Sequence, residues 1–277
     1  KVLVFGHQNP DMDTVGSAIA LSYLLNKTSK EAEAVALGTP NEETKFALNY
    51  FNLETPRVIE TASNEVSEVV LVDHNEKQQS VSDIDKVSVR AVVDHHRIAN
   101  FQTADPLYYR AEPVGCTATI ILKLFKESNV EIPREIAGVM VSAIISDTLL
   151  LKSPTCTQED ILAAEELAEI AGISLNEYGL EMLKAGTDIS DKSAADILND
   201  DAKSFPMGTD TVRIGQVNVV DVNDILLRKN DIIEIMREET RENDYSLYIL
   251  LVTDIIENNS IAIVDGPAYR QFEMAFN

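Results

Sequence analysis

The sequence predicts an α/β protein, with an N-terminal parallel-sheet domain that has helices on both faces and a smaller C-terminal α/β domain. Short apolar runs alternate with longer amphipathic stretches through the first half of the chain, which is typical of parallel strands joined by helices. The polar stretch AGTDISDKS, residues 185–193, interrupts this alternation. The chain has 277 residues, of which 45% are hydrophobic, so it is long enough to form two cores of ordinary size.

The first predicted domain covers residues 1–187. Its strands are expected where short apolar runs occur, at 2–5, 34–37, 68–72 and 90–93. Its helices are expected where apolar residues recur every three or four positions, near 14–26, 42–51, 117–128, 135–145, 157–171 and 175–184. The acidic stretch EDILAAEELAE within the helix at 157–171 is interpreted as a solvated face beside an apolar stripe.

The second predicted domain covers residues 188–277. Strands are expected at 212–220, 245–253 and 260–264, with a helix near 221–239 and another opening at Pro267. The sequence contains no internal repeat and no low-complexity segment, which excludes a solenoid and a flexible tether. A second α/β unit, smaller than the first, is therefore expected.

The composition narrows the class of protein. The 23 basic and 46 acidic residues give a net charge of −23, which repels a nucleic-acid backbone. No apolar run approaches the ~18 to 20 residues that a membrane helix needs. The two cysteines, Cys116 and Cys156, are too few for a disulfide framework and have no zinc-site spacing, so a reducing cytoplasm is the expected compartment. Cys116 is interpreted as a packing residue rather than a nucleophile.

Acidic and imidazole side chains follow the ends of three predicted strands. FGHQNPDMD, residues 5–13, places His7, Asp11 and Asp13 after the first strand. VVLVDHNE, residues 69–76, places Asp73 and His74 after a second apolar run. AVVDHH, residues 91–96, ends a third apolar run with Asp94, His95 and His96. Ligands of open parallel sheets bind at the carboxyl ends of the strands, so these side chains are expected to converge on one crevice.

A fourth feature is Asp147, which ends the apolar helical run VSAIISDT at 141–148 and would be costly to bury unless it were paired or bound to a metal. Each feature has a simpler alternative when taken alone. Asp13 could cap a helix that starts near Thr14, and a histidine could be satisfied in the core by a backbone carbonyl. All four features together, with every histidine of the chain included, favour a shared site.

Clustered carboxylates repel one another, so such a site needs cations at neutral pH. Mixed imidazole and carboxylate ligands suit manganese or cobalt better than calcium or magnesium, which prefer shells of oxygen. Two metals bridged by one aspartate would lie ~3.5 to 4 Å apart and share a water that is acidified into a nucleophile. These requirements predict hydrolysis of a phosphoric anhydride or ester.

The motifs DHH at 94–96, GHQNPDMD, LVDHNE and IISDT resemble those of the DHH phosphoesterase superfamily, and specifically the family II, manganese-dependent inorganic pyrophosphatases. The resemblance extends to RAEPVGCTAT at 110–119, KSPTCT at 152–157 and DAKSFPMG at 201–208, and so covers essentially the whole chain. It implies hydrolysis of pyrophosphate to two phosphates by a water or hydroxide that bridges two metals. The metals would be two Mn²⁺ per chain, with Co²⁺ possible, and Mg²⁺ would accompany the substrate.

The resemblance also implies roles for individual residues. One metal would bind His7, Asp11 and Asp73, and the other Asp13, Asp73, His95 and Asp147, with Asp73 as the bridge. His96 would face the substrate near the leaving phosphate, and Lys203 would reach the phosphates from the second domain. Asp94 and His74 would orient ligands through hydrogen bonds. The implied partners are pyrophosphate and a second copy of the chain in a homodimer formed at an edge of the N-terminal sheet, without nucleic acid or membrane.

Two alternatives remain open at this point. One is a member of the same superfamily that acts on short polyphosphate or small nucleotides, although the GGGH-like motif of the nucleic-acid members is absent. The other is a catalytically silent metal-binding protein. The sequence also ends at Asn277, before the basic SRKK-like segment with which members of the family continue. The second domain is therefore expected to be truncated, and a chain that ends here is expected to hydrolyse pyrophosphate poorly.

Overall fold

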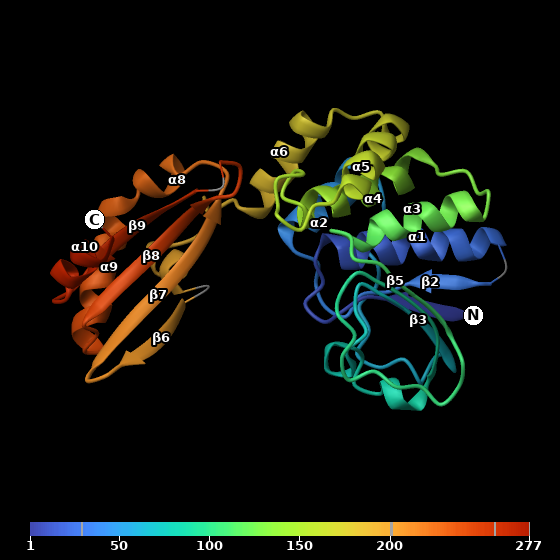
Figure 1. The fold of residues 1–277 in the computed structure, drawn as a ribbon, viewed down its shortest axis with the longest axis horizontal. Helices are drawn as coiled ribbons and strands as arrows, with labels where there is room; N and C mark the ends of the chain where they lie inside the picture. Colours follow the sequence, from blue (N-terminus) through green and yellow to red (C-terminus); the bar gives the residue numbers. More distant parts are fainter. Residues whose placement is uncertain (29, 200–201, 258, 277) are drawn as a thin grey trace. The chain divides into compact units, whose positions relative to one another are not determined.

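The computed structural model describes residues 1–28, 30–199, 202–257 and 259–276. The chain forms two compact units, Lys1–Gly186 and Thr187–Asn277, each with its own sheet (Figure 1). The predicted boundary lay between residues 187 and 188. No helix in the described ranges combines the length and the apolar character that crossing a bilayer requires.

The first unit is built on a five-stranded parallel sheet, which confirms the predicted fold class. The strand order is β2-β1-β3-β4-β5, and the strands are β1 (Val2–Phe5), β2 (Ala32–Ala34), β3 (Glu68–Val72), β4 (Ser88–Asp94) and β5 (Tyr108–Ala111). The strand β5 was not predicted. Its sequence, YYRA, is short and partly exposed at the sheet edge, so it carries no apolar run to mark it.

Six helices of the first unit lie close to the predicted positions. They are α1 (Met12–Thr28), α2 (Glu42–Tyr50), α3 (Thr117–Glu127), α4 (Arg134–Asp147), α5 (Gln158–Ala171) and α6 (Leu175–Gly186). Helices α1 and α3 pack against the sheet, and α4 packs against α1 and α5 on the side away from the strands (Figure 1). Helix α4 is apolar on nearly all sides because it is enclosed by neighbouring helices.

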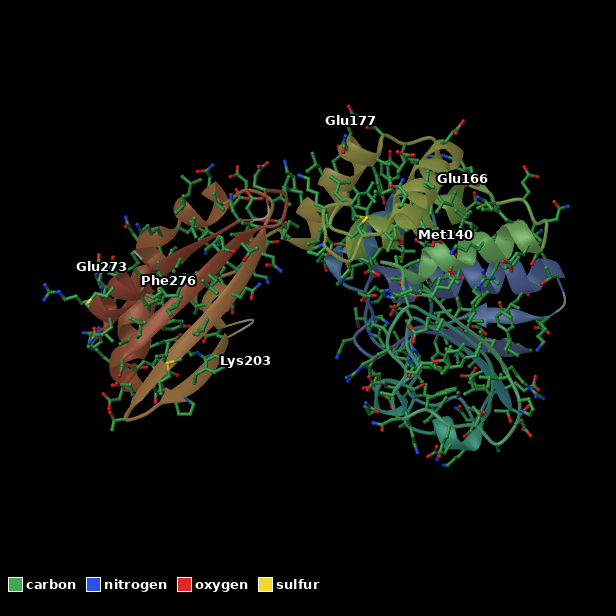
Figure 2. The ribbon with its side chains drawn as sticks, viewed as in Figure 1. Met140, Glu166, Glu177, Lys203, Glu273 and Phe276 are labelled. Carbon is green, nitrogen blue, oxygen red and sulfur yellow. The ribbon has the colours of Figure 1, made fainter. Side chains whose placement is uncertain are left out.

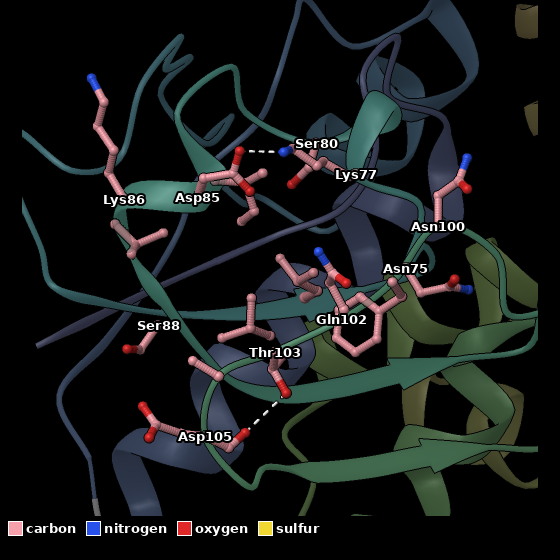
Figure 3. Close-up of a pocket in the computed structure, with 16 residues that line it drawn as sticks. Asn75, Lys77, Ser80, Asp85, Lys86, Ser88, Asn100, Gln102, Thr103 and Asp105 are labelled. Atoms are coloured by element: carbon pink, nitrogen blue, oxygen red, sulfur yellow. Dashed lines mark hydrogen bonds and ion pairs between the residues drawn. The ribbon is translucent and has the colours of Figure 1, made fainter.

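The other face of this sheet is covered by connecting segments. Leu3, Phe5 and Leu71 of the strands pack there against Val81 and Ile84 from the segment after β3. The helices on this face are two 3-10 turns, η1 (Lys77–Gln79) and η2 (Ile84–Lys86). A pocket of about 850 Å³ opens among these turns and the segment 100–105 (Figure 3).

The second unit is built on a four-stranded mixed sheet with the order β6-β7-β8-β9. Its strands are β6 (Ala202–Met207), β7 (Asp210–Val219), β8 (Leu247–Asp254) and β9 (Asn259–Asp265), and only the pair β7 and β8 is parallel. The strand β6 was not predicted, because an edge strand that contains Lys203 and Pro206 and is largely exposed lacks the apolar pattern of a buried strand.

The helices of the second unit are α7 (Ala194–Asn199), α8 (Asn223–Leu226), α9 (Lys229–Glu242) and α10 (Tyr269–Phe276). The single helix predicted near 221–239 is divided into α8 and α9 at Leu227 and Arg228. The Arg228 guanidinium donates a hydrogen bond to the Ile189 carbonyl, 3.1 Å away, and so ties this break to the start of the unit.

Candidate metal centre

The predicted site residues of the first unit lie at the carboxyl edge of its sheet. In the order β2-β1-β3-β4-β5, the direction in which strands are added reverses between β1 and β3, and ligands of such sheets bind outside the strand ends at this reversal. His7 follows β1, Asp73 follows β3, and His95 and His96 follow β4. The order of the strands therefore brings together residues that are up to 89 positions apart in the sequence, from 7 to 96.

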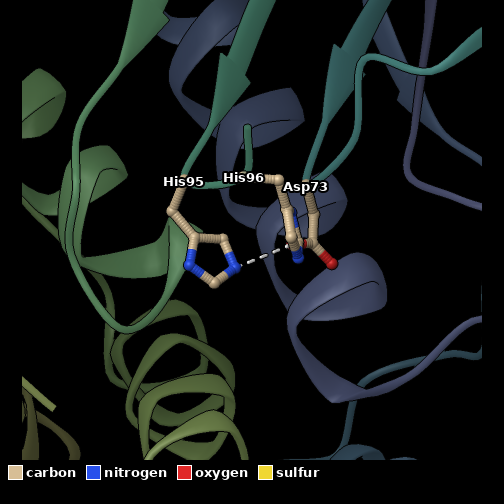
Figure 4. A group of neighbouring side chains, drawn as sticks. All are labelled: Asp73, His95 and His96. Atoms are coloured by element: carbon tan, nitrogen blue, oxygen red, sulfur yellow. Dashed lines mark ion pairs between the residues drawn. The ribbon is translucent and has the colours of Figure 1, made fainter. Parts of the chain in front are cut away.

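Asp73 lies at the centre of this edge. Its backbone has a φ of 56°, a left-handed conformation that is uncommon for a residue other than glycine and that is often found at functional sites. Its Oδ2 lies 3.4 Å from His7 Nε2, and its Oδ1 lies 3.3 Å from His95 Nε2, as Figure 4 shows for His95. The Thr14 hydroxyl donates to Oδ2 at 2.8 Å and the Thr117 hydroxyl to Oδ1 at 3.3 Å. The two oxygens of Asp73 thus face two different sets of side chains.

The first set, called the outer group, consists of His7, Asp11 and Asp73, whose donor atoms lie within 4.8 Å of one another. His7 Nε2 lies 3.3 Å from Asp11 Oδ2, while His7 Nδ1 lies 2.7 Å from the Gln8 carbonyl. A carbonyl only accepts, so the proton of a neutral His7 sits on Nδ1 and Nε2 is free to bind a metal. The Asp11 side chain is 42% exposed, so this group opens toward solvent.

The second set, called the inner group, consists of Asp13, Asp73, His95 and Asp147, again with donor atoms within 4.8 Å of one another. His95 Nε2 lies 3.9 Å from Asp13 Oδ2 and 3.8 Å from Asp147 Oδ2. His95 Nδ1 lies 3.0 Å from the Val114 carbonyl, which leaves Nε2 free as in His7. Asp13 is fully buried and the Asp147 side chain is 18% exposed, so the inner group is the more enclosed of the two.

Asp13 is held by a helix distant in the sequence. Its carboxylate accepts hydrogen bonds from the backbone N–H of Thr117 at 2.7 Å and of Ala118 at 3.2 Å, which belong to the first turn of α3. Ser17 Oγ donates a further bond at 2.6 Å. The simpler alternative, in which Asp13 caps its own helix, is wrong: Asp11 accepts the bond from Thr14 N at the start of α1.

The imidazoles of both groups favour their protonated forms when no metal is bound. Burial opposes the charge on His7, but hydrogen bonds with Asp11 and Asp73 outweigh it and raise the pKa of His7 to about 11. Burial likewise opposes the charge on His95, but its hydrogen bond with Asp73 and the charge of Asp13 raise the pKa of His95 to about 9. Burial disfavours the charge on Asp73 as well, yet its bonds with the two histidines hold its pKa below the usual range.

The remaining carboxyls of the inner group are forced toward their neutral forms. Burial and the charge of Asp73 raise the pKa of Asp13 to about 7. Burial, together with the charges of Asp13 and Asp73, raises the pKa of Asp147 well above its usual range. The inner group therefore fits a divalent cation, because the cation would replace the protons on these carboxyls and neutralise the crowded carboxylates.

His96 lies beside the inner group and is about half exposed, with Nδ1 3.6 Å from Asp73 Oδ1 (Figure 4). The buried Asp94 accepts hydrogen bonds from His96 N at 3.1 Å and His96 Nδ1 at 2.9 Å. Asn75 Nδ2 donates to the other Asp94 oxygen at 2.7 Å. Burial opposes ionisation of Asp94, but these bonds from His96 and Asn75 hold its pKa below the usual range.

His74 is buried, with Nδ1 2.9 Å from the Val72 carbonyl and its ring 6.2 Å from the Phe5 ring. Within the described part of the chain its Nε2 has no hydrogen-bond partner, and burial lowers the pKa of His74. Lys203, the other residue expected to bind substrate, lies on β6 of the second unit with an exposed side chain (Figure 2). The pocket on the opposite face of the sheet is lined by Asn75 but by none of the outer-group or inner-group residues (Figure 3).

Comparisons with known proteins agree with this arrangement. Residues 1–144 match the family model described as the DHH family, N-terminal domain, and residues 180–277 match that of the DHHA2 domain. The manganese-dependent inorganic pyrophosphatase of Bacillus subtilis is 56% identical over 277 residues, which cover all of this chain and 90% of that protein. The chain belongs to the family of manganese-dependent inorganic pyrophosphatases.

Other known proteins resemble this chain to different degrees. An Enterococcus faecalis protein named "Probable manganese-dependent inorganic pyrophosphatase" is 61% identical, again over the whole of this chain and 90% of its own. A crystal structure of a Methanococcus jannaschii protein assigned as a family II inorganic pyrophosphatase is 41% identical, with a TM-score of 0.70 over 99% of this chain and 90% of that one. A Bacteroides fragilis protein related to exopolyphosphatases, 13% identical with a TM-score of 0.56 over 91% of this chain and 75% of that one, shares the fold.

The site of this pyrophosphatase family member contains supporting residues that the sequence did not single out. The hydroxyls of Thr14, Ser17 and Thr117 donate to Asp13 or Asp73, and Asn75 supports Asp94. Three of them, Thr14, Ser17 and Asn75, lie within four positions of a predicted ligand, so the local sequence could have indicated them. Thr117 lies 44 positions from Asp73, and no pattern in the sequence joins the two.

Proposed function

We propose that the chain hydrolyses inorganic pyrophosphate to two phosphates with two manganese ions bound at its N-terminal sheet edge. The outer ion would be held by His7, Asp11 and Asp73, and the inner ion by Asp13, Asp73, His95 and Asp147. The observation that carries this proposal is the geometry of Asp73, whose Oδ2 faces the outer histidine at 3.4 Å and whose Oδ1 faces the inner histidine at 3.3 Å. The named function of the curated relatives supports the reaction.

When bound, the two ions would polarise phosphate oxygens and acidify a water for attack on phosphorus. The residues of the chain prepare for this chemistry by directing imidazole Nε2 atoms, whose protons a metal would displace, and carboxylate oxygens toward common points. The backbone carbonyls of Gln8 and Val114 fix the orientation and tautomer of His7 and His95. The N–H groups at the start of α3 keep Asp13 in place, so little reorganisation accompanies metal binding.

We propose that His96 contacts a phosphate of the substrate. The Nδ1 proton is bound by Asp94, and this hydrogen bond raises the pKa of His96, so the protonated ring would donate from Nε2. The half-exposed ring is accessible to a ligand. Lys203 is proposed to add a positive charge to the phosphates from the second unit, because its side chain is exposed on β6. Asp94 supports His96 in this scheme, whereas His74 contributes by packing behind β1.

We also propose a role for Mg²⁺, an oligomeric state and a cellular compartment. Mg²⁺ would enter with the substrate, since pyrophosphate is itself a strong ligand for hard cations. A homodimer would form at an edge of the first sheet, where Tyr108 of the edge strand β5 is 50% exposed. A reducing compartment such as the cytoplasm suits the two free cysteines.

The test compares substrates and metals. Phosphate release is measured from pyrophosphate, tripolyphosphate and bis-p-nitrophenyl phosphate, each with manganese and with magnesium alone. Rapid release from pyrophosphate with manganese is the expected result. Preference for tripolyphosphate would favour short polyphosphate as the substrate, hydrolysis of the diester would favour small nucleotides, and no release in any arm would favour a silent metal-binding protein.

A further inference from the structure

A buried carboxylate outside both metal groups lies beneath the loop that precedes α3. Asp160, the third residue of α5, is fully buried, so the interpretation of EDILAAEELAE as a solvated face is wrong at this position. Its Oδ2 accepts hydrogen bonds from Gly115 N at 2.8 Å and from Thr157 N and Oγ1 at 2.8 and 2.7 Å. Its Oδ1 accepts a bond from Thr119 Oγ1 at 2.6 Å. Asp160 therefore joins α5 to the loop at 113–116 and to the first turn of α3.

Helix capping accounts for only part of this arrangement. Asp160 and Thr157 form a capping box at the start of α5, which requires bonds between these two residues alone. The bonds from Gly115 and Thr119 come from residues 45 and 41 positions away and satisfy donors of a different segment. A buried carboxylate that accepts four bonds restrains its donors, because moving any one of them removes part of the compensation for the buried charge.

Gly115 is packed too closely for a side chain. A Cβ atom at this position would lie 2.8 Å from Asp160 Oδ2 and 3.1 Å from the Thr155 carbonyl oxygen. It would also lie 3.1 Å from the Thr148 methyl group. The loop at 113–116 is thus seated between α5 and the segment that follows α4, and its position depends on contact with Asp160.

The loop at 113–116 and the first turn of α3 that follows it hold two of the four inner-group residues. The Val114 carbonyl accepts the bond from His95 Nδ1, and the backbone N–H groups of Thr117 and Ala118 donate to Asp13. The outer residues His7 and Asp11 are held by other segments, since His7 Nδ1 contacts Gln8 and Asp11 accepts from Thr14. The shared Asp73 accepts from Thr117 through Oδ1, which faces the inner group, whereas Oδ2 faces His7 and accepts from Thr14. A displacement of the loop would consequently disturb the inner group and leave the outer group in place.

We propose that Asp160 is a positioning residue for the inner metal, acting through the loop at 113–116 on His95 and Asp13. This inference rests on the proposed two-metal function. Helix α5 contributes no metal ligand to the proposed two-metal site, yet through Asp160 it would set the affinity for the inner ion. Residues that orient metal ligands in this way typically contribute about 10- to 100-fold to metal affinity.

The test measures manganese binding to the metal-free full chain by calorimetry. Asp160→Ala should weaken binding of the inner ion about 10- to 100-fold and leave the outer ion unaffected. Asp160→Asn should restore most of the affinity, because the amide oxygen still accepts from Gly115 N and the amide nitrogen can donate to Thr119 Oγ1. This partial rescue separates positioning from loss of packing volume.

The matched control is Asp83→Ala. Asp83 is also a buried carboxylate that accepts backbone bonds from a distant loop, with Ala62 N and Ser63 N both at 2.9 Å. Among the residues that the structure describes, neither Ala62 nor Ser63 belongs to a metal group. This variant should lose stability and keep both manganese affinities. If Asp160→Ala does not fold, Gly115→Ala supplies a second test, because its Cβ would displace the loop while both side chains of the α5 capping box remain.

The outcomes separate the two proposals. Unchanged inner-ion affinity in a folded Asp160→Ala or Gly115→Ala chain would overturn the positioning role, as would an equal loss at both ions or an equal loss in Asp83→Ala. Binding of fewer than two ions by the unsubstituted chain would overturn the two-metal function and this inference together.

Discussion

The outer and inner groups share Asp73 but are held by the chain in different ways. The outer residues His7 and Asp11 follow a single strand and are fixed by neighbours at most three positions away. The inner residues come from α1, β4 and α4, and their supports reach across 104 positions, from Asp13 to Thr117. The comparison teaches that the outer group needs only one residue from a distant strand, Asp73, beside a local motif, whereas the inner group draws every residue and most of its supports from separate elements.

The largest effect is expected where the two groups meet. Asp73→Asn replaces one of the bridging carboxylate oxygens with a nitrogen that is a poor ligand, so both groups are weakened. Activity should fall at least ~1000-fold, equivalent to ~4 kcal/mol of transition-state stabilisation. His96→Gln leaves both groups intact and should cost less activity. The measurements are kcat/KM and metal content of both variants, and equal values in the two would contradict the division of roles.

A second prediction compares how much manganese bound at each group raises the thermal stability of the protein. Manganese at about 100 times its dissociation constant stabilises a folded protein by about 2.7 kcal/mol per site, or about 5–10 °C in Tm for a unit of this size. Asp13→Asn should lose most of the manganese-induced rise in Tm because the inner group holds the more enclosed ion. Asp11→Asn should keep most of it. Thermal scans with chelator and with manganese measure both, and the reverse ranking would contradict the comparison.

The third prediction concerns pH. A raised pKa in the metal-free protein means that a proton competes with the metal, and bound manganese requires a neutral imidazole, so affinity falls as the pH falls. The pKa of about 9 for His95 predicts an inner-ion affinity that levels off near that pH, whereas the pKa of about 11 for His7 predicts an outer-ion affinity that continues to rise. Dissociation constants measured between about pH 6.5 and 10 test this, and pH-independent binding would refute it.

The smallest effect is expected from a single hydroxyl of α1. Ser17→Ala removes the 2.6 Å bond to Asp13 and should weaken inner-ion binding about tenfold. Ser22→Ala is the matched control, because Ser22 is a buried serine of the same helix whose hydroxyl has no hydrogen-bond partner among the residues that the structure describes. Calorimetry should show unchanged binding for this control. Similar losses in both variants would mean that the bond from Ser17 does not support the inner group.

The outer group was accessible to sequence reasoning for a physical reason. His7, Asp11 and Asp73 follow apolar runs that read clearly as buried strands, and the parallel-sheet rule places strand ends together without any knowledge of side-chain contacts. The strands β5 and β6 were missed because edge strands need no continuous apolar run. The fold class could therefore be predicted, while one edge strand of each sheet could not.

The supports of the inner group were largely beyond such reasoning. Backbone groups carry no sequence signal, so the contacts of Val114 with His95 and of Thr117 with Asp13 appear only in three dimensions. Asp160 was hidden within an acidic run that resembles a solvated face. The spacing of Thr157 and Asp160, typical of a capping box, was the one local sign that Asp160 has a specific partner.

The most direct test of the two-group account is a manganese titration of the metal-free chain and of Asp11→Asn, with bound ions counted per chain. We expect two ions in the unsubstituted chain, bound with distinct affinities because the inner group is enclosed and held by α3 while the outer group is open to solvent. In Asp11→Asn we expect only the tighter ion to remain. A single ion in the unsubstituted chain, or loss of the tighter ion in Asp11→Asn, would contradict the account.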